Sequence, residues 1–339
     1  MSSLHRVRCR SSVVSVLIVS VVAASCGPAS PAAPDAAPRS TVPTGPAGRF
    51  TLTSTFDLDV PAAAAPVIAA LTAATDGPDD PTRYLVDRMI ATLPDGTVKT
   101  IAIQAAPYVA AYLNTRLADI APRFVAGIDA IATGLSRIAT HVGTIETLQV
   151  DDDGAALRTI TGVRFDVGAT PTTVGFADGG LADLVVGTHV FVDPTGRVTI
   201  GDHAHGWPYG AVLRLGLDRA VIASVEPAAR DLATALGALV DCGALGALIA
   251  DRLGLGSATL YRTACQAGMA AIASEIYAKI AAIDDTPLAL EVTGAAVGVD
   301  RDGDGTMDEL HDGRWSGWVG STASREPIGA AGFTATKAP

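Results

Sequence analysis

The sequence predicts an α+β protein in which an antiparallel meander sheet packs on alanine-rich helices. Apolar residues recur at helical spacing over residues 80–140 and 226–283, and they alternate with polar residues over 50–60, 143–217 and 288–319. Only 5% of the 339 residues are aromatic although 49% are hydrophobic, so small aliphatic side chains dominate the predicted core. Such side chains allow helices to pack closely.

The first 25 residues have the features of a secretory signal. Arg6, Arg8 and Arg10 precede an apolar run over residues 13–24. This run is shorter than the about 20 residues that a membrane-spanning helix needs. The following VAASC sequence, which ends at Cys26, resembles the lipobox of bacterial lipoproteins, although Ala23 stands where that motif most often has leucine. The alternative is ordinary signal cleavage near Ala24, which leaves Cys26 without a lipid.

The resemblance implies that Cys26 carries acyl chains such as palmitate and anchors the mature chain to a lipid bilayer of the bacterial cell envelope. Gly27 follows the cysteine in place of the aspartate that retains some lipoproteins at the inner membrane, which favours the outer membrane. Residues 26–48 are rich in proline and alanine, a composition typical of an extended tether.

The charge of the mature chain excludes some partners. Removal of residues 1–25 leaves 21 basic against 35 acidic residues, a net charge of −14. A net charge this negative argues against sequence-independent binding of nucleic acid and against attachment to anionic lipid by charge.

The part expected to fold is a single α+β domain over residues 49–335, or two subdomains, a helical one over 49–142 and a mixed one over 143–335. The segment 50–60 alternates as a half-buried strand does, and helical spacing follows over 62–75 and 80–93. Pro107 and Pro122 are expected to break the helical region 97–140.

Strand periodicity returns over residues 143–217, with turn signals at 153–154, 179–180 and 193–196. The nearly apolar stretch 232–250 has Asp241 at its centre, which favours two short helices over a membrane span. A C-terminal hairpin is predicted from the alternation at 288–292 and 315–319, with a β-bulge at Gly294.

Two cysteines remain in the predicted domain, Cys242 and Cys265. In an exported chain this pair is expected to form a disulfide that staples the helical segment. One alternative is that both cysteines are free buried thiols. Another is a metal site, although the sequence offers no obvious further ligands nearby.

The acidic run DRDGDGTMDE at residues 300–309 predicts a calcium site. Asp300, Asp302 and Asp304 are spaced by two, so that a tight loop turns their carboxylates toward one hard cation, and Gly305 permits the sharp turn that follows. Thr306 would contribute its carbonyl and Asp308 its side chain or a bridging water.

Over these ten residues the run resembles the calcium loops of the EF-hand and of dockerin or thrombospondin-type repeats. It departs from the EF-hand at the twelfth position, where His311 replaces the bidentate glutamate. Glu309 and Asp312 are the candidate substitutes. The alternative is a solvated acidic hairpin tip.

A second candidate metal site is the sequence DHAHGW at residues 202–207. His203 and His205 lie two apart and would project from one face of a strand, with Asp202 or His189 as further zinc ligands. The alternative is a pair of polar residues near a strand end.

The sequence lacks the GxSxG, GxGxxG and GxxxxGK motifs of common hydrolases and nucleotide-binding proteins. We therefore expect a non-catalytic binding or structural module with a calcium-stabilised hairpin, for which a lipid or another apolar molecule is the suggested ligand. The alternative function is a metal-dependent hydrolase that uses His203 and His205.

Overall fold

The computed structural model describes residues 42–59, 65–67, 69, 81–120, 123–321 and 323–338. The predicted signal, Cys26, most of the tether and most of the expected helix 62–75 lie outside the described residues. Residues 38–339 form one compact unit.

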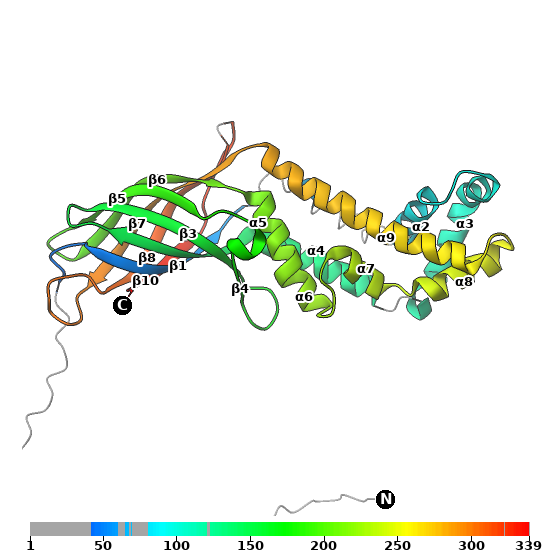
Figure 1. Cartoon of the computed structure of the whole chain (residues 1–339), viewed down its shortest axis with the longest axis horizontal. Coiled ribbons are helices and arrows are strands. Elements are labelled where there is room, and N and C mark those ends of the chain that lie inside the picture. The colour runs from blue at the N-terminus through cyan, green and yellow to red at the C-terminus, as the bar shows by residue number, and fades with distance from the viewer. Residues whose placement is uncertain are drawn as a thin grey trace, which may run out of the picture. The chain divides into compact units, whose positions relative to one another are not determined.

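Eight antiparallel strands form a closed barrel (Figure 1). The barrel strands are β1 (Gly48–Asp57), β2 (His141–Val150), β3 (Ala155–Phe165), β5 (Leu184–Val192), β6 (Arg197–Trp207), β7 (Leu288–Val299), β8 (Glu309–Gly320) and β10 (Ala331–Lys337). They follow one another in chain order, and β10 pairs with both β1 and β8. Two short strands lie outside this ring, β4 (Thr172–Gly175) beside β3 and β9 (Arg325–Pro327) beside β8.

The predicted mixture of helices and antiparallel strands is confirmed, but the prediction of a meander sheet is wrong, because the sheet closes into a barrel. Closure depends on pairing between the first and last strands, as in the pair Phe50 and Lys337. Alternation in a sequence shows which face of a strand is buried, whereas it does not identify a partner strand so distant in the chain.

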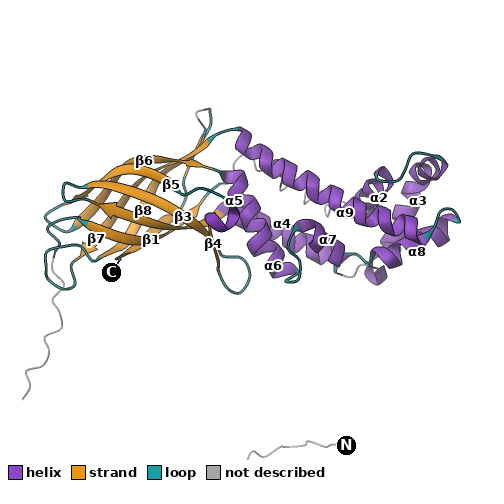
Figure 2. Ribbon diagram, in the orientation of Figure 1, coloured by secondary structure: helices purple, strands orange, loops and turns teal. Residues whose placement is uncertain are grey.

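The helices form two groups in the chain, and Figure 2 shows them apart from the strands. Between β1 and β2 the described helices are α2 (Pro81–Ala91), α3 (Thr97–Ile120) and α4 (Phe124–Thr140). Between β6 and β7 they are α5 (Tyr209–Gly216), the π-helical turn η2 (Leu217–Val221), α6 (Ile222–Val225), α7 (Leu232–Leu239), α8 (Cys242–Leu253), α9 (Ala258–Ala281) and the short 3-10 helix η3 (Ala282–Asp285).

Two expectations about these segments are wrong. The helix α3 continues through Pro107, whose ring lies on the exposed face while Ala106 and Ala110 pack in the core. The strand region expected to reach residue 217 ends at Trp207, and α5 follows almost at once.

The apolar stretch 232–250 forms two short helices, as predicted. The helices α7 and α8 bend by 57° relative to each other, and the Asp241 carboxylate caps α8 by accepting hydrogen bonds from the Gly243 and Ala244 amides. Among the described residues no single helix has the length and apolar character to cross a membrane, and only this bent pair meets both criteria together.

The bulge predicted at Gly294 is not present, because β7 alternates without a change of phase from Leu288 to Val299. The irregularities lie on the two neighbouring strands, on β6 between Ile200 and His203 and on β8, where Asp312 has a φ of 52°. Gly294 instead makes space for a neighbouring side chain, because a Cβ at this position would lie 2.6 Å from the ring of Trp315 inside the barrel.

Contacts among the helices that adjoin the barrel, and a contact between a helix and a barrel strand, lie where the two regions meet. The buried Tyr209 donates a 2.6 Å hydrogen bond to the Ala139 carbonyl, and Gly216 packs against the Phe165 ring with no space for a Cβ. The Asp284 carboxylate accepts hydrogen bonds of 2.7 and 2.8 Å from the first amides of α5.

Candidate functional site

A fully buried ion pair lies inside the barrel. Glu146 of β2 and Arg158 of β3 form two hydrogen bonds, Nε to Oε2 at 2.6 Å and Nη2 to Oε1 at 2.8 Å. Burial alone would raise the pKa of Glu146, but the Arg158 charge and hydrogen bonds from Arg158, Thr144 and Ser54 outweigh it and lower this pKa. The carboxylate therefore stays charged, and its charge is neutralised within the barrel.

The same guanidinium organises two aromatic neighbours. Its Nη1 lies 2.8 Å from Nε2 of His203, whose Nδ1 lies 2.7 Å from the Gly201 carbonyl. Because a carbonyl only accepts, Nδ1 carries the imidazole proton and Nε2 accepts from Arg158. The guanidinium carbon also lies 4.1 Å from the centre of the Trp315 ring, and Trp315 donates to Ser54.

His205 lies two residues further along β6 and is buried without a hydrogen-bond partner on either ring nitrogen. Burial, with smaller contributions from the Arg158 and His203 charges, lowers the pKa of His205 to about 3. The neutral imidazole is therefore the form that the barrel interior accommodates.

The four residues proposed as zinc ligands do not form one donor set. Both nitrogens of His203 have partners, and the Arg158 guanidinium beside it repels a cation. Asp202 and His189 are exposed on the outer wall, whereas His203 and His205 face inward. Among the described residues, the one group of histidine, cysteine or acidic side chains that could hold a metal ion is Asp300, Asp302 and Asp304.

These three carboxylates occupy the loop between β7 and β8, and their ligand atoms lie within 4.8 Å of one another. Asp300 is fully buried and accepts hydrogen bonds from the Gly303 and Gly305 amides at 2.7 and 2.9 Å. Asp304 is exposed, and hydrogen bonds from Thr306 lower its pKa. A carboxylate oxygen that accepts one hydrogen bond keeps a second lone pair, so these hydrogen bonds do not by themselves prevent coordination of a cation.

Asp308, a further predicted calcium ligand, has other partners, and a cation lies beside the Thr306 side chain. Asp308 accepts from the Arg301 amide at 2.8 Å and lies 3.7 Å from the Lys337 ammonium. Lys337 donates to the Thr306 hydroxyl at 2.6 Å. The loop thus brings together the first three predicted ligands, Asp300, Asp302 and Asp304. Asp308 instead binds the Arg301 amide and lies near the Lys337 ammonium.

The proposed substitutes for the twelfth ligand are not part of the carboxylate group either. Glu309 binds Arg301 at 2.5 Å and His311 at 2.6 Å, which lowers the pKa of Glu309. Asp312 lies on the β8 irregularity.

The segment that enters the fold contacts this loop. Thr44 donates to the Gly305 carbonyl from its amide at 2.9 Å and from its hydroxyl at 3.0 Å, and Gly45 forms a parallel bridge with Thr306. The acidic loop therefore connects the start of the described chain with β7 and β8.

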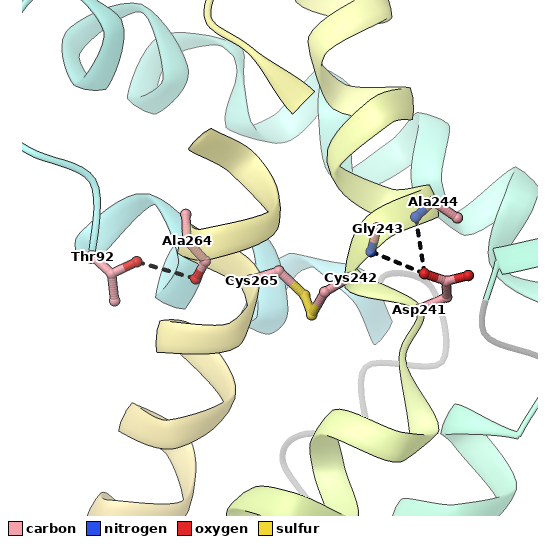
Figure 3. The surroundings of a disulfide bond; sticks show 7 residues. All are labelled: Thr92, Asp241, Cys242, Gly243, Ala244, Ala264 and Cys265. Atoms are coloured by element: carbon pink, nitrogen blue, oxygen red, sulfur yellow. Dashed lines mark hydrogen bonds between the residues drawn. A yellow bond between two sulfur atoms is a disulfide. The ribbon is translucent and has the colours of Figure 1, made fainter. Parts of the chain in front are cut away.

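The predicted disulfide between Cys242 and Cys265 is present (Figure 3). It joins the first turn of α8 to α9, and both sulfur-bearing side chains are buried. Next to it, Thr92 donates to the Ala264 carbonyl and connects the chain after α2 to α9.

The residues of the ion pair were not identified from the sequence, although a signal existed. Glu146 alternates in phase with Val142 and Leu148, and Arg158 is in phase with Ala156 and Ile160. A charged residue at a core position of a strand indicates a buried pair, because an isolated buried charge is very costly.

Comparison with protein-family models, curated proteins and solved structures finds no match for this chain. The function is therefore argued from the geometry.

Proposed function

We propose that this chain is an exported lipoprotein of the bacterial cell envelope, at the outer membrane, that acts as a non-catalytic binding or structural module. Cys26 is the acylated anchor, and the barrel is the folded part that it retains at the bilayer. The Cys242–Cys265 disulfide supports an oxidising compartment outside the cytoplasm.

The observation that carries the proposal is the gathering of three carboxylates at the point where the chain enters the barrel. Asp300, Asp302 and Asp304 repel one another at this spacing unless a cation neutralises them. Oxygen ligands alone favour calcium over softer metals. Bound calcium would neutralise this charge, and the loop would then hold Thr44 through the Gly305 carbonyl, which clamps the anchored end of the chain to β7 and β8.

The calcium proposal is tested by unfolding the full chain with urea in calcium and in a chelator. At calcium about one hundred times its dissociation constant, binding should add about 2.7 kcal/mol to the free energy of unfolding. Asp302→Asn should abolish this gain. Asp152→Asn is the matched control, because Asp152 lies in the exposed acidic turn between β2 and β3.

The control variant should respond to calcium as the wild type does. An equal gain in both variants, or no gain in the wild type, would contradict a specific site. Magnesium in place of calcium tests the choice of ion, since it demands a tighter octahedral geometry.

The anchor has a separate test. Cys26→Ser should move the protein from the membrane fraction to the soluble fraction and remove acyl chains detected by mass spectrometry. Unmodified Cys26 in the wild-type chain recovered from membranes would contradict it.

The apolar cavity among the helices does not favour the carriage of a lipid. An apolar cavity lined by α2, α3, α8 and α9 leaves about 20 Å³ for the centre of a water-sized sphere. That is close to the minimum for one water molecule, about 10–15 Å³, and far too small for an acyl chain. The hydrolase alternative likewise has no supporting observation, because His203 and His205 do not offer free nitrogens to one ion.

A further inference from the structure

The ladder between β5 and β6 is short. Only Val190–Val192 pair with Val198–Ile200, and in the described chain no pairing joins residues 184–189 of β5 to residues 201–207 of β6. In its ladder with β7, the register of β6 shifts between Ile200 and His203. Across to β5, Thr188 donates from its hydroxyl to the Gly201 carbonyl. The backbone ladder between β5 and β6 therefore ends at the pair Val190 and Ile200, which changes the outer wall of the barrel.

A trough of about 660 Å³ lies on this wall. Gly187 and Gly201 contribute no side chains to it, so its floor reaches the sheet backbone. Leu157 and Phe191, which are 51% and 62% exposed, supply apolar surface.

The trough also contains negative charge. Asp151 and Asp202 line it, and its lining includes no lysine or arginine. The His189 ring stacks on Phe191, with ring centres 6.1 Å apart. Aromatic and aliphatic surface beside carboxylates is the combination that holds an organic cation with an apolar stem, because the stem covers the apolar surface while the charge meets the carboxylates and the ring face.

From this charge complementarity we propose that the trough binds a lysine or arginine side chain on an extended segment of a partner protein. This inference rests on the proposed function as a binding module and names its partner as a basic, partly apolar polypeptide. Anionic lipid is disfavoured by the two carboxylates, and a second copy of this chain is disfavoured by its net charge of −11.

The test is calorimetric titration of the full chain with an acetylated tetrapeptide amide of alternating valine and lysine. Binding is expected, with weakening at higher ionic strength, whereas the matching valine–glutamate peptide should not bind. Asp202→Asn should weaken binding of the valine–lysine peptide by about threefold, the effect expected when one exposed charge pair is removed.

Gly187→Leu should weaken binding by at least about tenfold, because a leucine side chain would fill the floor that the peptide needs. No atom lies within 4 Å of a Cβ at Gly187, so the variant is expected to fold. Gly206→Leu is the matched control: this exposed strand glycine also has no atom within 4 Å of a Cβ and lies outside the trough.

Absence of binding by the wild type, equal binding of the glutamate peptide, or equal weakening by the two leucine variants would overturn the inference. All titrations are made in calcium, and the calcium-dependent stability of each variant is measured in parallel. If the peptide does not bind while the calcium response is intact, the inference about the trough fails and the proposed function does not.

Discussion

The Arg158 guanidinium contacts Glu146, His203 and Trp315 inside the barrel, and each contact uses a different part of the group. Two donors meet the carboxylate, a third meets an imidazole nitrogen, and the flat face covers an indole ring. Lysine has a single compact ammonium and reproduces none of this geometry. The charge of Arg158 is therefore balanced, and removal of either partner leaves the other charged and buried.

Arg158→Met is predicted to lower the free energy of unfolding by about 3–5 kcal/mol, because Glu146 is left as an uncompensated buried charge. The double variant with Glu146→Leu should recover most of this loss. Arg164→Met is the control on the same strand, where the exposed pair with Asp166 contributes at most about 1 kcal/mol. Urea unfolding measures all three, and a small effect of Arg158→Met alone would contradict the role of the pair.

The buried histidines predict a pH dependence. The folded pKa of His205 is about 3 and that of His203 is also lowered, in both cases chiefly by burial. The unfolded chain has histidine pKa values of about 6.5, so between these limits it binds more protons than the folded chain. Stability is therefore expected to fall as the pH decreases from about 6.5.

His205→Leu should make this dependence shallower between about pH 7 and pH 5, by up to about 1.4 kcal/mol per pH unit. Carboxylates with lowered pKa values, such as Glu146, titrate below this window. Urea unfolding at a series of pH values measures the slope. Direct titration of His205 by NMR is the check, and a native pKa near the unfolded value would contradict the prediction.

At the scale of elements, local patterns in the sequence identified most strands and helices. The turn residues Asp193–Gly196 correctly predicted the hairpin between β5 and β6, and Asp241 correctly predicted the break between α7 and α8. The closure of the barrel was not predictable, since β1 and β10 lie at opposite ends of the chain. The predicted helix break at Pro107 was wrong because this residue lies on the exposed face of α3. The predicted bulge at Gly294 was wrong because the missing side chain instead makes space for Trp315.

The candidate sites followed the same division. Asp300, Asp302 and Asp304 are close in sequence, and their proximity in space was predicted from their spacing. The partners of His203 are Arg158 on β3 and Gly201 within β6, so a two-residue spacing could not distinguish a zinc pair from a histidine bound to arginine. The trough depends on the short pairing between β5 and β6, which has no simple sequence signal.

The disulfide is an element-scale constraint, because it holds α8 against α9. Replacement of Cys242 and Cys265 by alanine is predicted to lower the free energy of unfolding by about 3 kcal/mol, the chain-entropy value for a loop of this length. The loop spans 23 residues. Thr263→Ala on the exposed side of α9 is the control. Reduction of the wild type should give a similar loss in urea unfolding, and an unchanged midpoint after reduction would contradict it.

At the scale of the whole molecule, the helices meet the barrel where Gly216 of α5 packs on Phe165 of β3. Tyr209 and Asp284 join helices whose ends adjoin barrel strands. Tyr209 follows β6 almost at once, and Asp284 lies shortly before β7. Such contacts couple the stabilities of the two regions. The calcium loop and the disulfide should then contribute to one cooperative transition, with effects that add because they share no contacting residues.

The cooperativity has a direct measurement, because all three tryptophans, Trp207, Trp315 and Trp318, lie in barrel strands. Tryptophan fluorescence therefore reports the barrel, while far-ultraviolet circular dichroism reports mainly the helices. The two urea transitions of the wild type are predicted to coincide. Tyr209→Ala removes a buried ring and its hydrogen bond to Ala139, which costs about 3–5 kcal/mol and weakens the junction. In this variant the helical transition should move to lower urea than the barrel transition, whereas coincident transitions at lower urea would show that other contacts suffice to couple the two regions.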